Sequence, residues 1–157
     1  MTAERLAAAL EREHHEIDSG IEAFLDRRED GERRVHGLRQ AIEALRRHIS
    51  LEEEFLFPPL QDAGLVAPIF VMLREHGEIW NTMDALDTQM RDRTECGPSE
   101  RKCRELLAQL ERHNSKEEAV IYPQADTMLP AETDAALRAF LTSGQTPSGW
   151  TCRQAPA

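Results

Sequence analysis

Two stretches of the sequence place a histidine and a glutamate four residues apart within helical apolar patterns. The stretch "HISLEEEFLFP" begins at His48 and contains Glu52, and "HNSKEEAVIYP" begins at His113 and contains Glu117. Residues four apart in a helix lie on the same face, one turn from each other. Imidazole and carboxylate groups are both common metal ligands. The spacing therefore makes both pairs candidates for binding metal.

A related motif surrounds two further histidines. "EHHEI" contains His14 and "EHGEI" contains His76, 62 residues later (76 − 14 = 62), while the two His–Glu pairs are 65 residues apart (113 − 48 = 65). The chain thus repeats a helical hairpin that carries one histidine on its first helix and a His–Glu pair on its second. Two such hairpins packed with approximate two-fold symmetry bring four imidazoles and two carboxylates together. His15 and His36 fall outside the apolar stripes of their helices.

Burial of this set of side chains predicts metal binding. A single histidine in an apolar stripe is usually an ordinary core residue, but four of them with a repeated glutamate are not expected by chance. A buried ionised carboxylate is costly unless it is paired or binds a metal ion. Neutral imidazoles carry no countercharge, whereas a pair of divalent cations satisfies all six side chains.

The elements that must position these residues are four long helices. Glycine- and proline-rich breaks place them at about residues 2–28, 32–59, 68–92 and 100–122, with Ser99 as an N-cap and Pro68 in a first turn. Pro58 and Pro123 are expected to end the second and fourth helices. A short amphipathic segment comes next, at residues 134–141.

This pattern predicts an all-α fold, an up-down-up-down four-helix bundle with a short C-terminal helix. The bundle domain is expected over residues 1–143. Residues 144–157, rich in Gly, Pro and Ser, are expected to form a flexible tail.

Composition narrows the classes of partner. The 157 residues suit one domain, and the net charge of −10 with no basic block argues against nucleic acid or an anionic membrane as a partner. No apolar run approaches the roughly 18 residues that span a bilayer, and the N terminus lacks a signal-peptide pattern. Three cysteines without metal-type spacing favour reduced thiols in a cytoplasm. Cys103 is expected in the core. For Cys152 in the tail, a redox-active thiol is the alternative to an ordinary reduced one.

The complete motif set resembles the hemerythrin-like domains of the bacterial HHE cation-binding kind, over residues 14–123. The resemblance implies two non-haem iron ions joined by an oxo or hydroxo bridge, with two of the ligands as bridging carboxylates, Glu52 and Glu117. The ligands that it implies are His14, His48, Glu52, His76, His113 and Glu117.

Two positions depart from the oxygen-carrying animal hemerythrins. Trp80 stands where those carriers have a second histidine on the third helix, so one iron has one imidazole fewer. Their fourth-helix carboxylate corresponds to Glu118, whereas Glu117 matches the bacterial pattern and the internal repeat. Both departures argue against simple reversible oxygen carriage.

The sequence is compatible with three functions from different classes. The first is a cytoplasmic di-iron protein that binds O2, NO or iron for storage, sensing or stress protection, with a partner protein if it is a sensor. The alternative is a di-iron enzyme acting on peroxide, oxygen or NO, although no general acid or base is identifiable from the sequence. The third is a bundle stabilised by zinc or by no metal, but zinc prefers four tetrahedral ligands. The sequence does not specify the small molecule or the oligomeric state.

Overall fold

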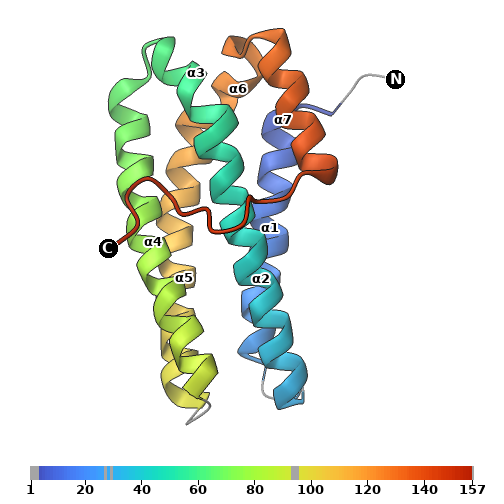
Figure 1. Cartoon of the computed structure of the whole chain (residues 1–157), viewed down its shortest axis with the longest axis vertical. Helices are drawn as coiled ribbons and strands as arrows, with labels where there is room; N and C mark the ends of the chain where they lie inside the picture. Colours follow the sequence, from blue (N-terminus) through green and yellow to red (C-terminus); the bar gives the residue numbers. More distant parts are fainter. Residues whose placement is uncertain (1–3, 27, 29, 93–95, 157) are drawn as a thin grey trace.

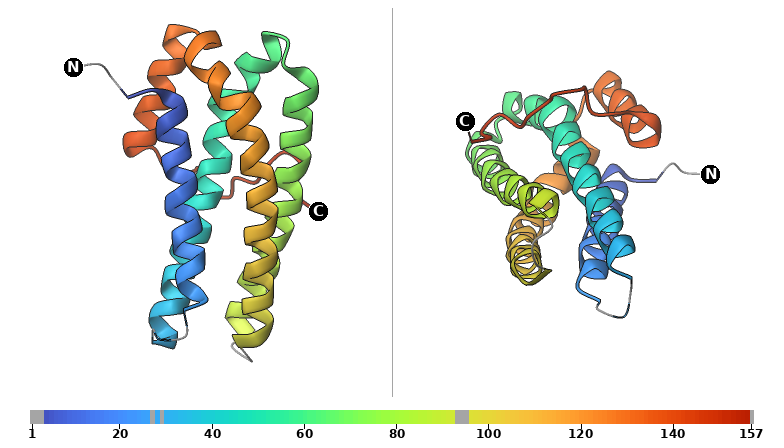
Figure 2. Two further views of the ribbon diagram at one scale, coloured as in Figure 1. Left: turned by 180° about the vertical axis from the view of Figure 1, so that it is seen from behind. Right: turned by 60° about the horizontal axis from the view of Figure 1, so that its bottom comes forward.

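Four long helices form an antiparallel up-down-up-down bundle (Figures 1 and 2). The computed structural model describes residues 4–26, 28, 30–92 and 96–156, without the side chains of 96–98, and all regular structure within these residues is helical. The long helices are α1 (Leu6–Phe24), α2 (Gly31–Leu51), α4 (Val66–Asp92) and α5 (Cys96–Lys116). The predicted fold class is confirmed. None of the described helices combines the length and apolarity needed to cross a membrane.

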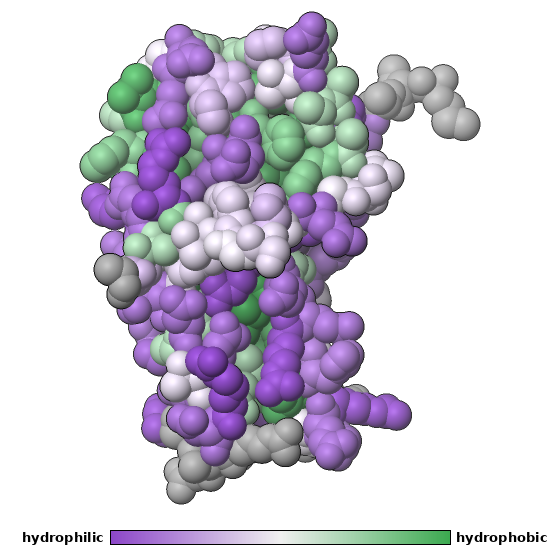
Figure 3. All heavy atoms as spheres, viewed as in Figure 1, coloured by the Kyte–Doolittle hydropathy of each residue, from purple (hydrophilic) through white to green (hydrophobic). Residues whose placement is uncertain are grey.

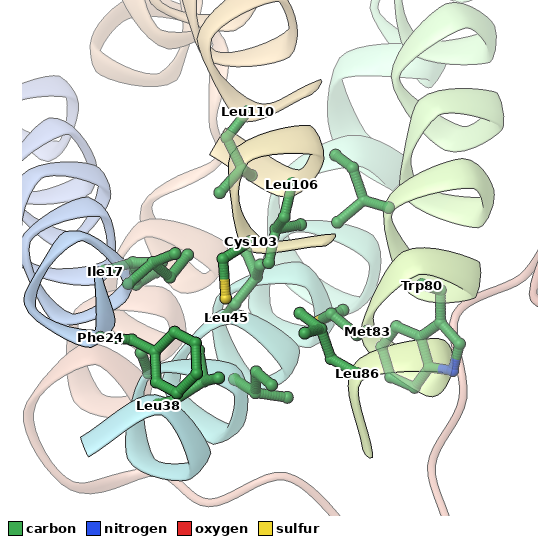
Figure 4. Close-up of a cluster of buried hydrophobic side chains, with 14 of the residues drawn as sticks. Ile17, Phe24, Leu38, Leu45, Trp80, Met83, Leu86, Cys103, Leu106 and Leu110 are labelled. Carbon is green, nitrogen blue, oxygen red and sulfur yellow. The ribbon is translucent and has the colours of Figure 1, made fainter. Parts of the chain in front are cut away.

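Each long helix buries one apolar stripe, and the stripes meet in two separate clusters. The first cluster, shown in Figure 4, includes Ile17, Leu45, Met83 and Leu106. The second cluster includes Leu10, Leu56, Ile69 and Leu137. Burial of one such side chain contributes about 1.5–3 kcal/mol, so the two clusters account for much of the stability of the bundle. The histidines and glutamates of the sequence motifs lie along the helices between these clusters.

The second and fourth long helices do not end at their prolines, which corrects the expectation from sequence. α2 continues through a π-helical turn, η1 (Glu52–Leu56), into α3 (Phe57–Asp62). α5 likewise continues through η2 (Glu117–Ile121) into α6 (Tyr122–Met128).

The reason is the hydrogen bonding of the wide turns. The Phe57 N–H donates to the carbonyl of Glu52, and the Tyr122 N–H donates to the carbonyl of Glu117, both across five residues. The prolines then fall in the first turn of the following helix, where a missing N–H costs little.

Other boundaries differ by a few residues from those expected. α1 ends at Phe24 rather than near Arg28, and α4 begins at Val66, with Pro68 in its first turn as predicted. Ser99 lies inside α5, so its assignment as an N-cap is wrong. The short C-terminal helix is confirmed as α7 (Ala131–Ser143), which packs beside α2 and η1.

Residues 144–156 cross the outside of the bundle from α7 to α4 (Figure 1). Figure 3 shows this segment as a pale band across the face of the molecule. The Arg47 guanidinium donates to the carbonyl of Gly144 (2.9 Å), Trp150 packs edge-on against Trp80 with ring centroids 5.6 Å apart, and Cys152 is buried. The structure therefore holds the tail at several points, whereas composition predicted a flexible segment; its mobility in solution stays a prediction.

The start of α1 is capped by a residue from α6. The Leu6 N–H donates to Asp126 Oδ1 (2.8 Å), and the Ala7 N–H donates to Asp126 Oδ2 (3.2 Å). These contacts satisfy two of the four backbone N–H groups that a helix leaves unpaired at its N terminus.

We expect Asp126→Ala to lower the free energy of unfolding by about 1 kcal/mol, the usual effect of losing an N-terminal cap. Asp126→Asn keeps one carboxamide oxygen for the Leu6 N–H, so its loss should be smaller. Urea unfolding followed by circular dichroism measures both variants. Wild-type stability in Asp126→Ala would show that this cap contributes nothing.

Candidate metal centre

Six side chains named by the sequence motifs converge in the middle of the bundle. Each is 3% exposed or less. Their donor atoms form two overlapping groups of four, and within each group the atoms lie within 4.8 Å of one another. The first donor group is His14, His48, Glu52 and Glu117, and the second donor group is Glu52, His76, His113 and Glu117. His15 and His36 are exposed, in agreement with their predicted positions outside the stripes.

The two shared glutamates connect the groups through different oxygens. Glu52 Oε2 lies 3.4 Å from His48 Nε2, and Glu52 Oε1 lies 3.2 Å from His76 Nε2. Glu117 Oε1 lies 3.1 Å from His14 Nε2, and Glu117 Oε2 lies 3.1 Å from His113 Nε2. Each carboxylate thus faces one histidine of each group, which is the arrangement of a carboxylate that bridges two ions.

The other ring nitrogen of each histidine faces a carboxylate outside the six. These contacts hold the Nδ1 atoms, so the Nε2 atoms point to the centre. The pairs are His14 with Glu118 (3.2 Å), His48 with Glu13 (2.9 Å), His76 with Glu53 (2.7 Å) and His113 with Glu75 (3.0 Å). A carboxylate in this position fixes the tautomer and orientation of an imidazole and raises its basicity as a ligand. Glu118 therefore lies behind His14, and Glu117 lies in the centre.

Tyr122 belongs to the centre and was missed by the sequence analysis. Its hydroxyl oxygen lies 2.7 Å from His14 Nε2, 3.0 Å from His48 Nε2, 2.7 Å from Glu52 Oε2 and 2.9 Å from Glu117 Oε1. The oxygen is therefore surrounded by the four donors of the first group.

The internal repeat contains the signal that could have found Tyr122. The residue 65 positions earlier is Phe57 (122 − 65 = 57), in the equivalent place after the His–Glu pair. Phe57 stacks on His76 with ring centroids 5.4 Å apart, and Tyr122 stacks on His14 at 5.2 Å. At this aromatic position the two halves of the centre therefore differ by one hydroxyl group.

Three buried atoms of the second donor group have no hydrogen-bond partner among the described residues. They are Glu52 Oε1, His76 Nε2 and Glu117 Oε2. His76 Nε2 and Glu52 Oε1 are close to each other but lack hydrogen-bond geometry. Unpaired buried polar groups cost about 1–3 kcal/mol each, and more when charged. A cation between these atoms satisfies all three, so the residues present fit a bound metal ion.

The charges of the centre compensate one another in the absence of metal. Burial alone lowers the pKa of His48, but the charge of Glu52 and the hydrogen bond to Glu13 outweigh it and raise this pKa to about 10. At His113, burial again lowers the pKa, but the charge of Glu117 and the hydrogen bond to Glu75 outweigh it and raise the pKa to about 10. The hydrogen bond from His113, with that from Lys116, lowers the pKa of Glu75 to about 2. Metal ions would replace the protons on these imidazoles.

A helical bundle with a buried centre of histidines and shared carboxylates is a known way to hold paired metal ions. The family model of the hemerythrin HHE cation-binding domain matches residues 5–125, and the chain belongs to this family. The match includes the four long helices and the whole centre, and ends before α7 and the tail. No significant match was found among curated proteins or among solved structures.

The raised pKa values predict how the metal-free protein responds to alkali. Between the ordinary histidine pKa of 6.5 and about 10, the folded state keeps protons on His48 and His113 that the unfolded state has lost. Their stabilisation is therefore complete below pH 6.5 and is lost as the pH rises to about 10.

We expect the urea midpoint of chelator-treated protein to decrease over this interval. The metal-loaded protein is the control, because its imidazoles are already deprotonated. A midpoint that stays constant or rises in the metal-free protein would contradict the protonated state of both histidines.

Proposed function

We propose that this protein holds two non-haem iron ions and uses them to handle a small ligand, O2, NO or iron itself, in storage, sensing or stress protection. The observation that carries the proposal is the geometry of Glu52 and Glu117. Because each carboxylate faces one histidine in each donor group, the centre is built for two adjacent ions rather than one.

The donor set favours iron over zinc. Four imidazole nitrogens with carboxylate oxygens form a mixed set that suits iron, whereas zinc prefers four tetrahedral ligands. An oxo or hydroxo bridge between the ions is part of the proposal, on the strength of the family resemblance. When bound, two iron ions supply redox chemistry and coordination positions for a small molecule.

The second donor group is the proposed place for the small ligand. The Tyr122 hydroxyl supplies an additional oxygen to the first donor group, and Phe57 leaves the equivalent position of the second group without one. All six donors are almost fully buried. Access is therefore limited to molecules of a few atoms, such as diatomic gases or peroxide.

The cellular location and the partners of the protein are also part of the proposal. Cys103 and Cys152 are both free and buried, which agrees with the reducing conditions of a cytoplasm. A role in sensing would transmit the state of the centre to a partner protein. Nucleic acid and membranes are not expected as partners.

The alternative is an enzyme that consumes peroxide, oxygen or NO at the same centre. It is favoured by Tyr122, which provides the proton donor that the sequence analysis did not identify. Burial and the charges of Glu117 and Glu52 raise the pKa of Tyr122, so the hydroxyl keeps its proton in the metal-free protein. A buried hydroxyl in contact with the centre can donate a proton to a bound oxygen species.

The ligand set predicts which variants lose metal. We expect the wild-type protein to contain about two irons per chain after expression in iron-supplemented medium, measured by mass spectrometry. His48→Ala and Glu52→Ala should each lose two-metal loading, because each removes a donor from the first group and Glu52 also serves the second. His15→Ala and His36→Ala are the matched controls and should load normally. Equal loss in all four variants, or a wild-type protein without iron, would refute the proposal.

Tyr122→Phe separates the two roles of the tyrosine. If the phenol oxygen binds iron, the wild-type ferric protein has a visible phenolate-to-iron absorption band, and we expect Tyr122→Phe to lose it. Identical spectra with slower consumption of peroxide in Tyr122→Phe would instead indicate a proton donor. The distances to four donor atoms lead us to expect the first result.

A further inference from the structure

The C-terminal tail reaches a histidine of the centre through one intervening carboxylate. The main-chain N–H of Arg153 donates to Glu53 Oε1 (2.8 Å), and Glu53 Oε2 accepts from His76 Nδ1 (2.7 Å). Glu53 and His76 are both buried. The two oxygens of Glu53 are thus divided between the tail and the imidazole, so the position of the tail is coupled to that of His76.

The tail has a defined seat on α4 beside this contact. Gly77 follows His76, and a Cβ atom at position 77 would lie 2.5 Å from the carbonyl oxygen of Gln154. The absence of a side chain on Gly77 is therefore what allows the backbone of the tail to approach the helix. The Ala155 N–H donates to the Cys152 carbonyl (3.1 Å), which closes a turn with Arg153 at its second position.

Aromatic and polar contacts hold the same segment, which we call the C-terminal strap (residues 149–155). The Trp150 indole N–H donates to Glu54 Oε1 (3.0 Å), and its ring packs against Trp80. Cys152 is buried in the apolar cluster that contains Trp80. Glu53 and Glu54 are consecutive residues of η1, so the strap binds the π-helical turn at two points.

The four carboxylates that face the histidine Nδ1 atoms are called the outer carboxylates: Glu13, Glu53, Glu75 and Glu118. Two of the other three also accept a hydrogen bond from a side chain of the bundle itself. Glu13 receives the Arg47 guanidinium (3.1 Å), and Glu75 receives the Lys116 ammonium. Glu53 is held instead by a main-chain amide from a segment beyond residues 5–125, the part of the chain that matches the family. This support therefore comes from outside the matched domain.

We propose that the C-terminal strap is a positioning element of the second donor group, in which the Arg153 main-chain N–H fixes Glu53 and thereby orients His76 for its metal ion. The inference rests on the proposed function, since it assigns the strap to the same centre. Contacts behind a ligating histidine commonly change metal affinity by 10–100-fold when removed. Because the strap acts one hydrogen bond further out, we expect an effect of about 10-fold, at the lower end of that range.

A pair of substitutions at one position tests the hydrogen bond. Arg153→Pro removes the N–H that holds Glu53, and proline is a favoured residue at the second position of a turn. Arg153→Ala keeps the N–H and removes the exposed side chain, which makes it the matched control. Titration of the full-length metal-free protein with ferrous iron under anaerobic conditions measures both ions. We expect Arg153→Pro to bind the ion of the second donor group about 10-fold more weakly. Arg153→Ala should bind both ions as the wild type does.

A second pair of substitutions tests the seat without changing the sequence of the strap. Gly77→Ala places a methyl group against Gln154 and should displace the strap, with the same weakening of the second ion. Gly37→Ala is the control. Gly37 lies in another long helix, α2, and a Cβ atom there would meet nothing within 4 Å. Alanine favours helix over glycine, so weaker binding in Gly77→Ala with intact helicity would not reflect unfolding.

Nitrogen NMR of the histidine rings gives a readout that needs no metal. In the metal-free protein, Arg153→Pro should shift the His76 ring signals and leave those of His14 unchanged, whereas Arg153→Ala should shift neither. Wild-type affinity for both ions in Arg153→Pro and Gly77→Ala would overturn the inference and leave the proposed function intact. A wild-type protein that binds no iron would instead overturn the proposed function, and with it the effect of the strap on metal.

Discussion

Two fully buried glutamates in the middle of a helical bundle set the requirement that the surrounding structure meets. Glu52 and Glu117 have no exposed surface, and ionised carboxylates in such a place are strongly destabilising without compensating partners. Four imidazoles face their oxygens, and outer carboxylates hold those imidazoles in turn. Removing one member of a buried charge cluster typically costs about 3–5 kcal/mol, because its partners remain buried and uncompensated. In the metal-free protein the protonated imidazoles supply this compensation, and bound metal ions would replace their protons.

The bundle accommodates this polar layer by separating two apolar clusters and by widening two helices. Each π-helical turn begins at one of the shared glutamates and is followed by an aromatic residue that stacks on a histidine. The wide turns also allow the helices to continue past their prolines. π-helical turns often occur at functional sites, and here both copies mark the centre. Because the two aromatic residues are Phe57 and Tyr122, the internal symmetry of the backbone carries a chemically asymmetric pair of donor groups.

The residues beyond the family match bring the C-terminal part of the chain into this network. Arg47 contacts Glu13 and also the end of α7, while the Arg153 amide contacts Glu53. Two of the four outer carboxylates are therefore linked to the segment that comes after the four-helix domain.

The sequence by itself determined the helical class, the stripes and the six residues that meet in the centre. This was achieved because helical periodicity is local and because the motif occurs twice. The expectation that helices end at Pro58 and Pro123 was wrong. A proline usually ends a helix, and the wide hydrogen bonding of a π-helical turn has no comparable signal in composition.

Only the tertiary structure decided which carboxylate stands behind each histidine, that Tyr122 enters the first donor group, and that Gly77 receives the strap. Most of these contacts join residues far apart in the chain, such as Tyr122 and His14, and side-chain packing between helices, not local preference, brings them together. The tail shows the same limit, because its Gly-, Pro- and Ser-rich composition describes the freedom of the isolated segment. Its place on the bundle depends on partners such as Glu53 and Trp80, which belong to other helices.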